Sequence, residues 1–383
     1  MNRLTGATLV LPDRLQPHGD ITWSDGRIVS IADAGPHGSH EHGRHFIVPG
    51  FIDVHVHGVE GIDALDGAGA VSRMAARLPR FGVTAFCPTS IACPPADLRR
   101  MLNGIRAARE AAVPTSARVL PGHLESNFIN ADFKGAQPQT CIRAPHEAPE
   151  GAFSGGEILD EIAAARPDVG IITLAPEIHG VLELIPELVR HGHRVSLGHS
   201  GATYEQARAG ILAGARHATH LFNRMTPLDH RAPGLAGAVL ESPDVAAEII
   251  CDGVHVHPAA VRAAVAAKGP SKVMAITDGT AGSGLPRGGR ASLGGRAITL
   301  GDAAYLDDGT LAGSVLTMDR AFAMLVKGMG FSLIEAALMC STTPARELGL
   351  HGFGALAAGA VADFVLLDQE LRVVETYISG VRI

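Results

Sequence analysis

Eight short apolar runs between residues 51 and 279 constrain the fold of this chain more than any other feature. Most of them are followed by a segment with helix-like periodicity, for example residues 95–112, 181–192 and 258–269. A strand followed by a helix, repeated eight times, is the pattern of a (β/α)₈ barrel. The sequence therefore predicts an α/β fold with a TIM-like barrel, whose strands lie within residues 51–58, 83–90, 117–126, 169–177, 194–200, 217–223, 247–256 and 272–279.

The two ends of the chain differ from this body. Residues 1–48 have the character of short strands joined by turns, with Ser24, Asp25 and Gly26 as one turn signal. The last segment reads in the same way. We expect the ends to meet as a small β-sandwich domain of residues 1–48 and 351–383, beside a barrel domain of residues 49–350.

Polar and reactive side chains gather at the C-terminal ends of the predicted strands: His55, His57, Glu125, Glu177, His199, His220, Asn223, Asp252, His255 and Asp278. In a (β/α)₈ barrel all these ends open onto one face, where the active site lies. Any one of these residues alone could be a loop or capping residue, but the repetition favours a shared pocket. Two long segments, residues 127–154 and 280–314, are expected to cover or shape that pocket as loops.

Histidine and carboxylate ligands without cysteine suit zinc or another divalent first-row metal in a catalytic site. Calcium would require more oxygen ligands, and a redox iron site is a weaker alternative. A metal of this kind lowers the pKa of its bound water to about 7. Asp278, at the end of the last strand, is placed to take a proton from that water and pass it to a leaving group. The pattern predicts hydrolysis of a carbonyl compound.

Other motifs carry less weight. Histidine pairs with the spacing of His55 and His57 recur at His191 and His193, which precede the fifth strand and are expected on the surface of the opposite face. Glu177 is expected to form supporting hydrogen bonds around the site. No P-loop, G-x-S-x-G or strand-turn-helix G-x-G-x-x-G motif occurs, which argues against nucleotide-binding, serine-hydrolase and dinucleotide-binding functions.

The composition limits location and partners. The formal net charge is −7 and no basic stripe is present, so nucleic acid is a poor candidate partner. No apolar run approaches the roughly 18 residues of a membrane helix, and the N-terminus lacks a secretory signal. The five cysteines form no C-x-x-C pair, which favours free thiols in the cytoplasm.

A set of ordered motifs resembles one known family. The motifs are PGFIDVHVHG, GHLE, LAPE, LGHS, THLFN, PGLAGAVL, DGVHVHP, TDGTAG, LAGSVLTM and PARELGL, followed by GALAAGAVADFVLLD. Together, from about residue 47 to the end, they resemble the N-acetylglucosamine-6-phosphate deacetylases of the amidohydrolase superfamily. The resemblance implies a homodimeric enzyme that converts N-acetylglucosamine 6-phosphate to glucosamine 6-phosphate and acetate.

The resemblance also implies roles for matching positions. The expected ligands of an essential metal are Glu125, His199 and His220. His55 and His57 are the expected ligands of a second metal, bridged to the first through Glu125. Some members of the family lack this histidine pair and use one metal, so one or two Zn²⁺ ions are expected here.

By the same resemblance, Asp278 is the acid/base and His255 polarises the acetamide carbonyl of the substrate. The positions that match substrate contacts of the family, in addition to His255, are Asn223, Arg224, Arg231, Ala136, Gln137, Leu311, Ala312 and Gly313.

This chain departs from the family pattern around the sugar. Ser126 and Asn127 replace a usual Gly-Pro pair, Gln137 stands where histidine is common, and Arg224 where alanine is common. The preference between N-acetylglucosamine and N-acetylgalactosamine 6-phosphates therefore stays open. Hydrolysis of another small amide and a non-catalytic metal-binding or sugar-binding role are further alternatives.

Overall fold

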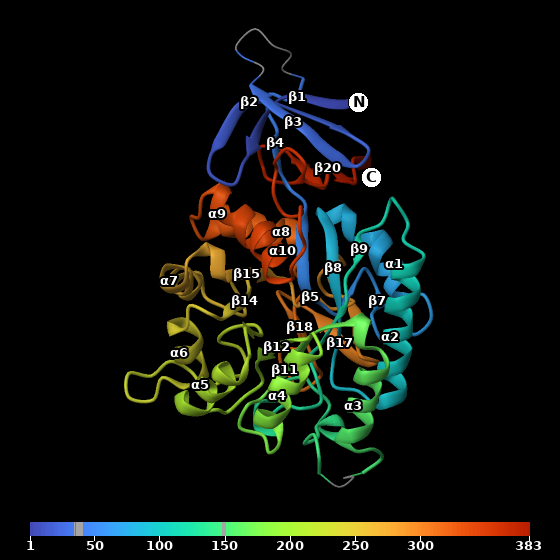
Figure 1. Ribbon diagram of the computed structural model, residues 1–383, viewed down its shortest axis with the longest axis vertical. Coiled ribbons are helices and arrows are strands. Elements are labelled where there is room, and N and C mark those ends of the chain that lie inside the picture. Colours follow the sequence, from blue (N-terminus) through green and yellow to red (C-terminus); the bar gives the residue numbers. More distant parts are fainter. Residues whose placement is uncertain (34, 36–40, 148–150) are drawn as a thin grey trace.

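The computed structural model describes residues 1–33, 35, 41–147 and 151–383. A sheet built from both chain ends lies at one end of the molecule, and a barrel surrounded by helices forms the rest (Figure 1). The predicted segment 127–154 falls partly outside the described residues.

Eight parallel strands form the barrel, which confirms the fold class expected from the sequence. They pair in the order in which they follow along the chain: β5 (Phe51–Val56), β8 (Val83–Ser90), β10 (Gly122–Leu124), β11 (Val169–Leu174), β12 (Arg194–Leu197), β13 (His217–Ala218), β14 (Ala246–Ile250) and β15 (Val273–Ile276). A short strand, β9 (Arg118–Val119), also pairs with β8. The last strand closes toward the first through a parallel bridge between Val56 and Gly279, and the N–H of Asp278 donates to the carbonyl of His55 over 2.9 Å.

These strands are apolar because they are covered on both faces. All eight residues of β8 are buried, as are all six of β11, and such continuous burial is typical of a parallel sheet under helices. The covering helices are α1 (Ala70–Arg77), α2 (Pro95–Glu110), α3 (Gly155–Ala164), α4 (Val181–Arg190), α5 (Tyr204–Ala213), α6 (Gly234–Glu241), α7 (Pro258–Lys268), α8 (Met318–Ala323), α9 (Leu333–Ala337) and α10 (Thr343–Glu347). The loop before α6 extends away from the barrel (Figure 1).

The two chain ends form one seven-stranded sheet with a hydrophobic core of its own. Trp23 of β2 lies several strands away from Phe364 and Tyr377 in the sheet, yet its ring centroid is 5.2 and 5.4 Å from theirs. The sheet therefore folds over itself into two packed layers. In pairing order its strands are β21 (Val381–Arg382), β20 (Val373–Ile378), β19 (Phe364–Leu367), β4 (Phe46–Pro49), β1 (Asn2–Val10), β2 (Leu15–Ser24) and β3 (Arg27–Asp33). We propose that residues 1–48 and 351–383 form one domain and that residues 49–350 form the barrel domain.

The Gly-rich segment 280–314 is more ordered than a loop. It contains a three-stranded sheet of β16 (Arg290–Leu293), β17 (Arg296–Leu300) and β18 (Ala304–Tyr305), packed with Ile91 on a small core. The turns between its short strands use many glycines, which hid the strands from sequence analysis. A small hairpin of β6 (Gly58–Val59) and β7 (Ile62–Asp63) follows the first barrel strand.

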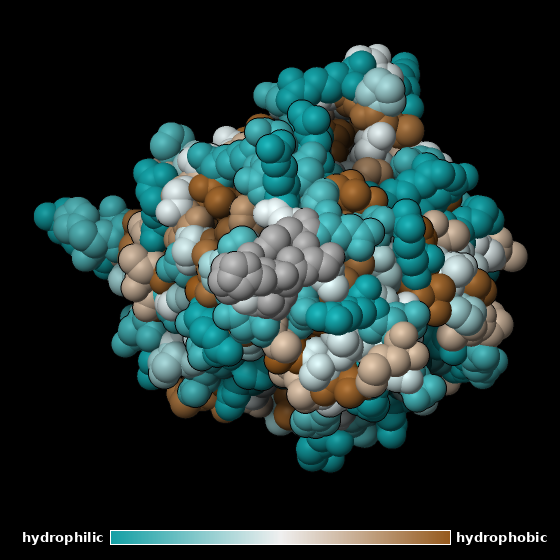
Figure 2. All heavy atoms as spheres, turned by 90° about the horizontal axis from the view of Figure 1, so that it is seen from above, coloured by the Kyte–Doolittle hydropathy of each residue, from teal (hydrophilic) through white to brown (hydrophobic). Residues whose placement is uncertain are grey.

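One expectation about the surface is wrong. His193 is buried, and its Nδ1 lies 2.9 Å from the carbonyl oxygen of Val169, because the turn after α4 folds onto the start of the neighbouring strand. Seen from the end that carries the terminal sheet, the surface is mostly hydrophilic with small hydrophobic patches (Figure 2). Among the described residues, no helix is both long and apolar enough to cross a bilayer.

Candidate metal centre

One carboxylate and two imidazoles meet at the C-terminal mouth of the barrel. Glu125 follows β10, His199 follows β12 and His220 follows β13. Oε1 of Glu125 lies 2.8 Å from Nε2 of each histidine, and the two Nε2 atoms are 3.0 Å apart. All three side chains are buried, so the predicted ligands of the first metal do converge.

A second group lies beside the first, at the C-terminal end of β5. The Nε2 atoms of His55 and His57 are 3.3 Å apart, and Nε2 of His57 is 3.4 Å from Oε2 of Glu125. Oδ1 of Asp278 lies 3.4 Å from Nε2 of His55 and 3.1 Å from Nε2 of His57. Glu125 thus contacts both groups, and Asp278 faces the second.

The donor atoms fit divalent metal ions. The Nδ1 atoms of His55, His57 and His199 lie within 3.2 Å of acceptor oxygens, so Nε2 of each ring is the nitrogen that faces the other donor atoms. Ring nitrogens that approach one another at 3.0 to 3.3 Å repel unless a proton or a metal cation lies between them. Imidazole and carboxylate donors without cysteine are those that zinc accepts in catalytic sites.

The backbone is strained at this centre. Three of the converging residues that are not glycine have left-handed φ angles: His199 at 46°, His220 at 31° and Asp278 at 48°. Such conformations cost about 1–3 kcal/mol each and persist where the surrounding structure enforces them, commonly at functional sites. This backbone conformation directs the three side chains into the barrel mouth.

The site concentrates negative charge. Burial alone would raise the pKa of Glu125 and of Asp278, but the adjoining imidazoles outweigh burial and lower the pKa of both. Burial lowers the pKa of His55 to about 4, so its imidazole is neutral. Burial opposes protonation of His57 as well, but hydrogen bonds to Asp278 and Glu125 raise its pKa to about 10. The ionised carboxylates therefore favour a positive charge at this point.

A pocket opens directly onto this centre. Its walls include most of the residues predicted to contact the substrate, and two more that were not predicted, Gly135 and Leu293. The predicted residues in the wall are Ala136, Gln137, Asn223, Arg224, His255, Asp278, Leu311 and Gly313, together with His57, Glu125, His199 and His220. Residues from seven different loops therefore surround one cavity.

Hydrogen bonds orient several of these side chains. Nδ1 of His255 lies 2.6 Å from Oδ2 of Asp252, which leaves Nε2 as the ring atom available to a ligand. Both polar atoms of the Gln137 amide are engaged: Nε2 donates to Oε2 of Glu125, and Oε1 accepts from the N–H of Ala92. Gln137 therefore holds the carboxylate shared by the two metal groups.

Two glycines shape the wall. Gly313 has φ 70°, and a Cβ there would lie 2.9 Å from the carbonyl oxygen of Asp278. Gly135 has φ 57°, and a Cβ there would lie 2.8 Å from Nε of Arg224. Ala312 is buried behind the wall, so its predicted substrate contact stays a prediction.

Arg231 lies outside this pocket. It is exposed on the loop that precedes α6, where its N–H donates to Oδ1 of Asp229. Arg231 does not meet the other predicted residues within this chain.

Glu177 and Glu248 form hydrogen bonds around the candidate metal centre. The carboxylate of Glu177 accepts hydrogen bonds from Ser200 and Gly201, which directly follow His199. Oε2 of Glu248 lies 2.9 Å from Nδ1 of His55. Sequence reasoning missed Glu248, although a charged residue within the apolar strand AEIICDG was a usable signal.

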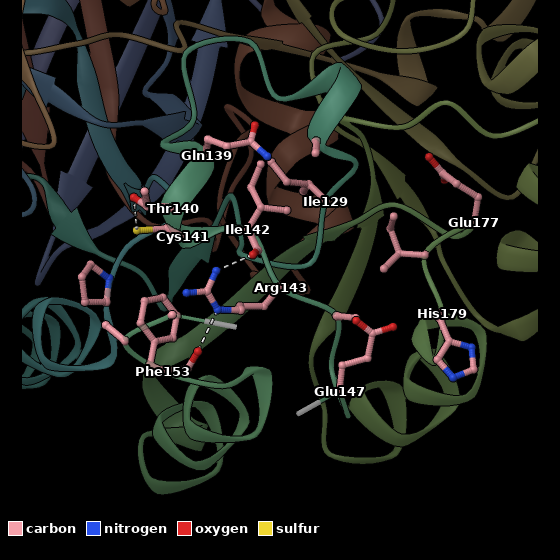
Figure 3. Close-up of a pocket in the computed structure, with 16 residues that line it drawn as sticks. Ile129, Gln139, Thr140, Cys141, Ile142, Arg143, Glu147, Phe153, Glu177 and His179 are labelled. Atoms are coloured by element: carbon pink, nitrogen blue, oxygen red, sulfur yellow. Dashed lines mark hydrogen bonds between the residues drawn. The ribbon is translucent and has the colours of Figure 1, made fainter. Parts of the chain in front are cut away.

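A larger cavity of about 790 Å³ lies elsewhere, beside residues 139–144 and 151–153 (Figure 3). The guanidinium of Arg143 is engaged within the wall of this cavity, where it donates to the carbonyls of Phe153 and Ile142. None of the three metal-ligand groups found in the described chain has a residue here. The chemistry therefore resides in the smaller pocket.

Comparisons with known proteins identify relatives of this chain. Residues 46–383 match the amidohydrolase family. N-acetylglucosamine-6-phosphate deacetylase of Danio rerio is 38% identical over 348 residues, which are 87% of this chain and 83% of the relative. N-acetylgalactosamine-6-phosphate deacetylase of Escherichia coli O157:H7 is 35% identical over 360 residues, which are 93% of this chain and 92% of the relative.

Solved structures extend the likeness to the whole fold. N-acetylglucosamine-6-phosphate deacetylase of Thermotoga maritima superposes with a TM-score of 0.87 at 33% identity, covering 100% of this chain and 99% of that one. A mutant of the Mycobacterium smegmatis enzyme in complex with N-acetyl-D-glucosamine-6-phosphate gives 0.89 at 33% identity, covering 99% and 98%. The chain therefore belongs to the N-acetylglucosamine-6-phosphate deacetylase family of the amidohydrolases.

Proposed function

We propose that this hydrolase removes the acetyl group of N-acetylglucosamine 6-phosphate, giving glucosamine 6-phosphate and acetate. The observation that carries the proposal is the meeting of Glu125, His199, His220 and Asp278 at one pocket, in a chain whose relatives bear this activity. The product amine would enter amino-sugar catabolism.

In this proposal Glu125, His199 and His220 would hold one Zn²⁺, and His55 and His57, together with Glu125, would hold a second. A bound divalent metal supplies Lewis-acid chemistry, polarising oxygen and lowering the pKa of water. The close approach of Nε2 atoms in both groups supports this assignment of ligands.

Asp278 moves the proton. Its ionised carboxylate accepts a proton from the water that attacks the acetamide carbon, and then gives that proton to the nitrogen as the C–N bond breaks. The lowered pKa of Asp278 keeps the carboxylate ionised before the reaction begins. Acetate and a free amine are the products.

His255 stabilises the charge that develops on the carbonyl oxygen. Asp252 binds its Nδ1 edge, which fixes the ring and leaves Nε2 as the edge that faces that oxygen. This contact strengthens as the carbonyl carbon becomes tetrahedral.

The anionic end of the substrate would bind near Asn223 and Arg224. Arg224 is exposed in the pocket wall, and no other described residue forms a hydrogen bond or ion pair with its guanidinium. A free guanidinium suits a phosphate. We further propose a cytoplasmic homodimer, in which the exposed Arg231 of one subunit completes the phosphate site of its partner.

Ala136, Gln137 and the segment Leu311 to Gly313 are proposed to border the sugar ring. Gln137 would border the ring through van der Waals contact, because both polar atoms of its amide already have hydrogen-bond partners.

The galacto epimer is the second candidate substrate. The E. coli relative named for N-acetylgalactosamine 6-phosphate is nearly as similar as the one named for the gluco epimer. An assay of acetate release with zinc-loaded protein, comparing both 6-phosphates and unphosphorylated N-acetylglucosamine, tests the proposal. We expect turnover of at least one phosphorylated sugar and far less of the unphosphorylated one. Inactivity on both phosphates would refute the proposal.

A further inference from the structure

Glu248 is a buried carboxylate in the middle of barrel strand β14. All five residues of the strand are buried, and the side chain of Glu248 is 0% exposed. An ionised carboxylate inside a barrel is unfavourable unless an opposite charge and hydrogen bonds compensate it. Glu248 lies below the pocket rather than in its wall, so it is not placed to touch a substrate.

The contacts of Glu248 lead to one metal ligand. Oε2 lies 2.9 Å from Nδ1 of His55, whereas Oε1 has no hydrogen-bond partner among the described residues. His123 is nearby at 3.8 Å, but its Nδ1 is engaged by the carbonyl of Val54 and its Nε2 by Thr173. His55 is therefore the main partner of this carboxylate.

We propose that Glu248 is the positioning residue that makes the His55/His57 group bind a second divalent metal ion. By accepting the Nδ1 proton of His55, Glu248 keeps the Nε2 lone pair directed toward His57 and Asp278. A cation bound between His55, His57 and Asp278 would compensate the charge of an ionised Glu248. Direct ligation by Glu248 in a group with His55 and His123 is disfavoured, because both ring nitrogens of His123 already have hydrogen-bond partners outside that group.

The expected effect of Glu248 on metal binding is specific to the His55/His57 group. The side chain of Glu248 makes no hydrogen bond to the side chains of Glu125, His199 or His220. Toward the first group it meets backbone only: its carboxylate lies beside the N–H of His220, and its own carbonyl accepts from the N–H of Leu221. Loss of the carboxylate should therefore lower affinity at one site and spare the other.

The inference rests on the proposed metal-dependent function. Counting the bound metal ions distinguishes a failure of the inference from a failure of the proposed function. Zn²⁺ would be titrated into metal-free wild-type protein, Glu248→Gln, Glu248→Leu and the control Ser196→Ala, with bound zinc per subunit measured by mass spectrometry. Ser196 is also buried in the barrel, where its Oγ contacts Thr219 and no metal ligand.

We expect two Zn²⁺ per subunit in the wild type and the control. Second-site affinity should fall about 10- to 100-fold or more in Glu248→Leu, and less in Glu248→Gln, whose amide oxygen still accepts from His55. First-site affinity should stay the same in both. Glu248→Gln is nearly isosteric and keeps the test valid if the leucine variant does not fold.

Two results would overturn the inference: a wild type that binds one ion, or variants that bind two with unchanged affinities. A wild type that binds no zinc would instead contradict the proposed function.

Discussion

The terminal sheet and the barrel mouth each have a buried interior, but the side chains that fill the two interiors are of opposite character. In the terminal sheet the core is apolar and Trp23 packs edge-on against Phe364 and Tyr377. At the barrel mouth the buried groups are imidazoles and carboxylates, held on left-handed backbone at His199 and Asp278. Departure from the rules of stable packing therefore marks the region that performs chemistry.

The largest expected effect is on catalysis, at the barrel mouth. Asp278→Asn should lower kcat by about 10²- to 10⁴-fold, because the amide cannot accept the proton of the attacking water. Zinc bound by Glu125, His199 and His220 and the thermal midpoint should change little. Steady-state kinetics beside metal analysis checks this prediction, and a variant that retains near-normal kcat would assign the proton transfer to another group.

The matching change in the terminal sheet should affect stability alone. Trp23→Ala should lower the free energy of unfolding by about 3–5 kcal/mol, because it leaves a cavity beside Phe364 and Tyr377. It also removes the hydrogen bond from Nε1 to the carbonyl of Gly380. Denaturant unfolding measures the loss. The kcat of the folded protein should equal that of the wild type, and a large fall in kcat would show that the two regions are coupled.

A smaller effect is expected at the amide that holds the shared carboxylate. Gln137→Met keeps the approximate size of the side chain but removes its hydrogen bonds to Glu125 and Ala92, and should weaken zinc binding about 10- to 100-fold. Competition with a chelator of known affinity measures the change. If KM for the sugar phosphate rises while zinc affinity is unchanged, Gln137 serves the substrate instead.

The smallest effect is expected at the rim of the pocket. Arg224→Ala should raise KM by about tenfold or more, since a hydrogen bond to a charged group contributes about 1.5–3 kcal/mol, and kcat should change little. Arg262→Ala is the matched control, because Arg262 is an exposed arginine on α7 away from the pocket. Equal KM values for the two variants would remove Arg224 from the phosphate site.

Much of this architecture could be predicted from the sequence. The apolar runs marked the barrel strands, and the polar residues at their C-terminal ends marked the face on which His55, Glu125 and Asp278 meet. These features are local in the chain, because strand period, helix period and strand ends can each be read within about ten residues.

The features that could not be predicted from the sequence depend on contacts between segments far apart in the chain. No local pattern indicates that Glu248 reaches His55 over 193 positions of sequence, or that Gln137 turns its amide toward Glu125. The burial of His193 and the sheet within residues 280–314 were missed for the same reason, since packing against distant segments decides both.

Anomalous diffraction at the zinc edge, from crystals of the zinc-loaded protein, tests the central claim most directly. We expect one peak about 2.0–2.2 Å from the donor atoms of Glu125, His199 and His220, and a second between His55 and His57. Absence of a peak at Glu125, or a zinc ion held by other residues, would contradict this account of the site.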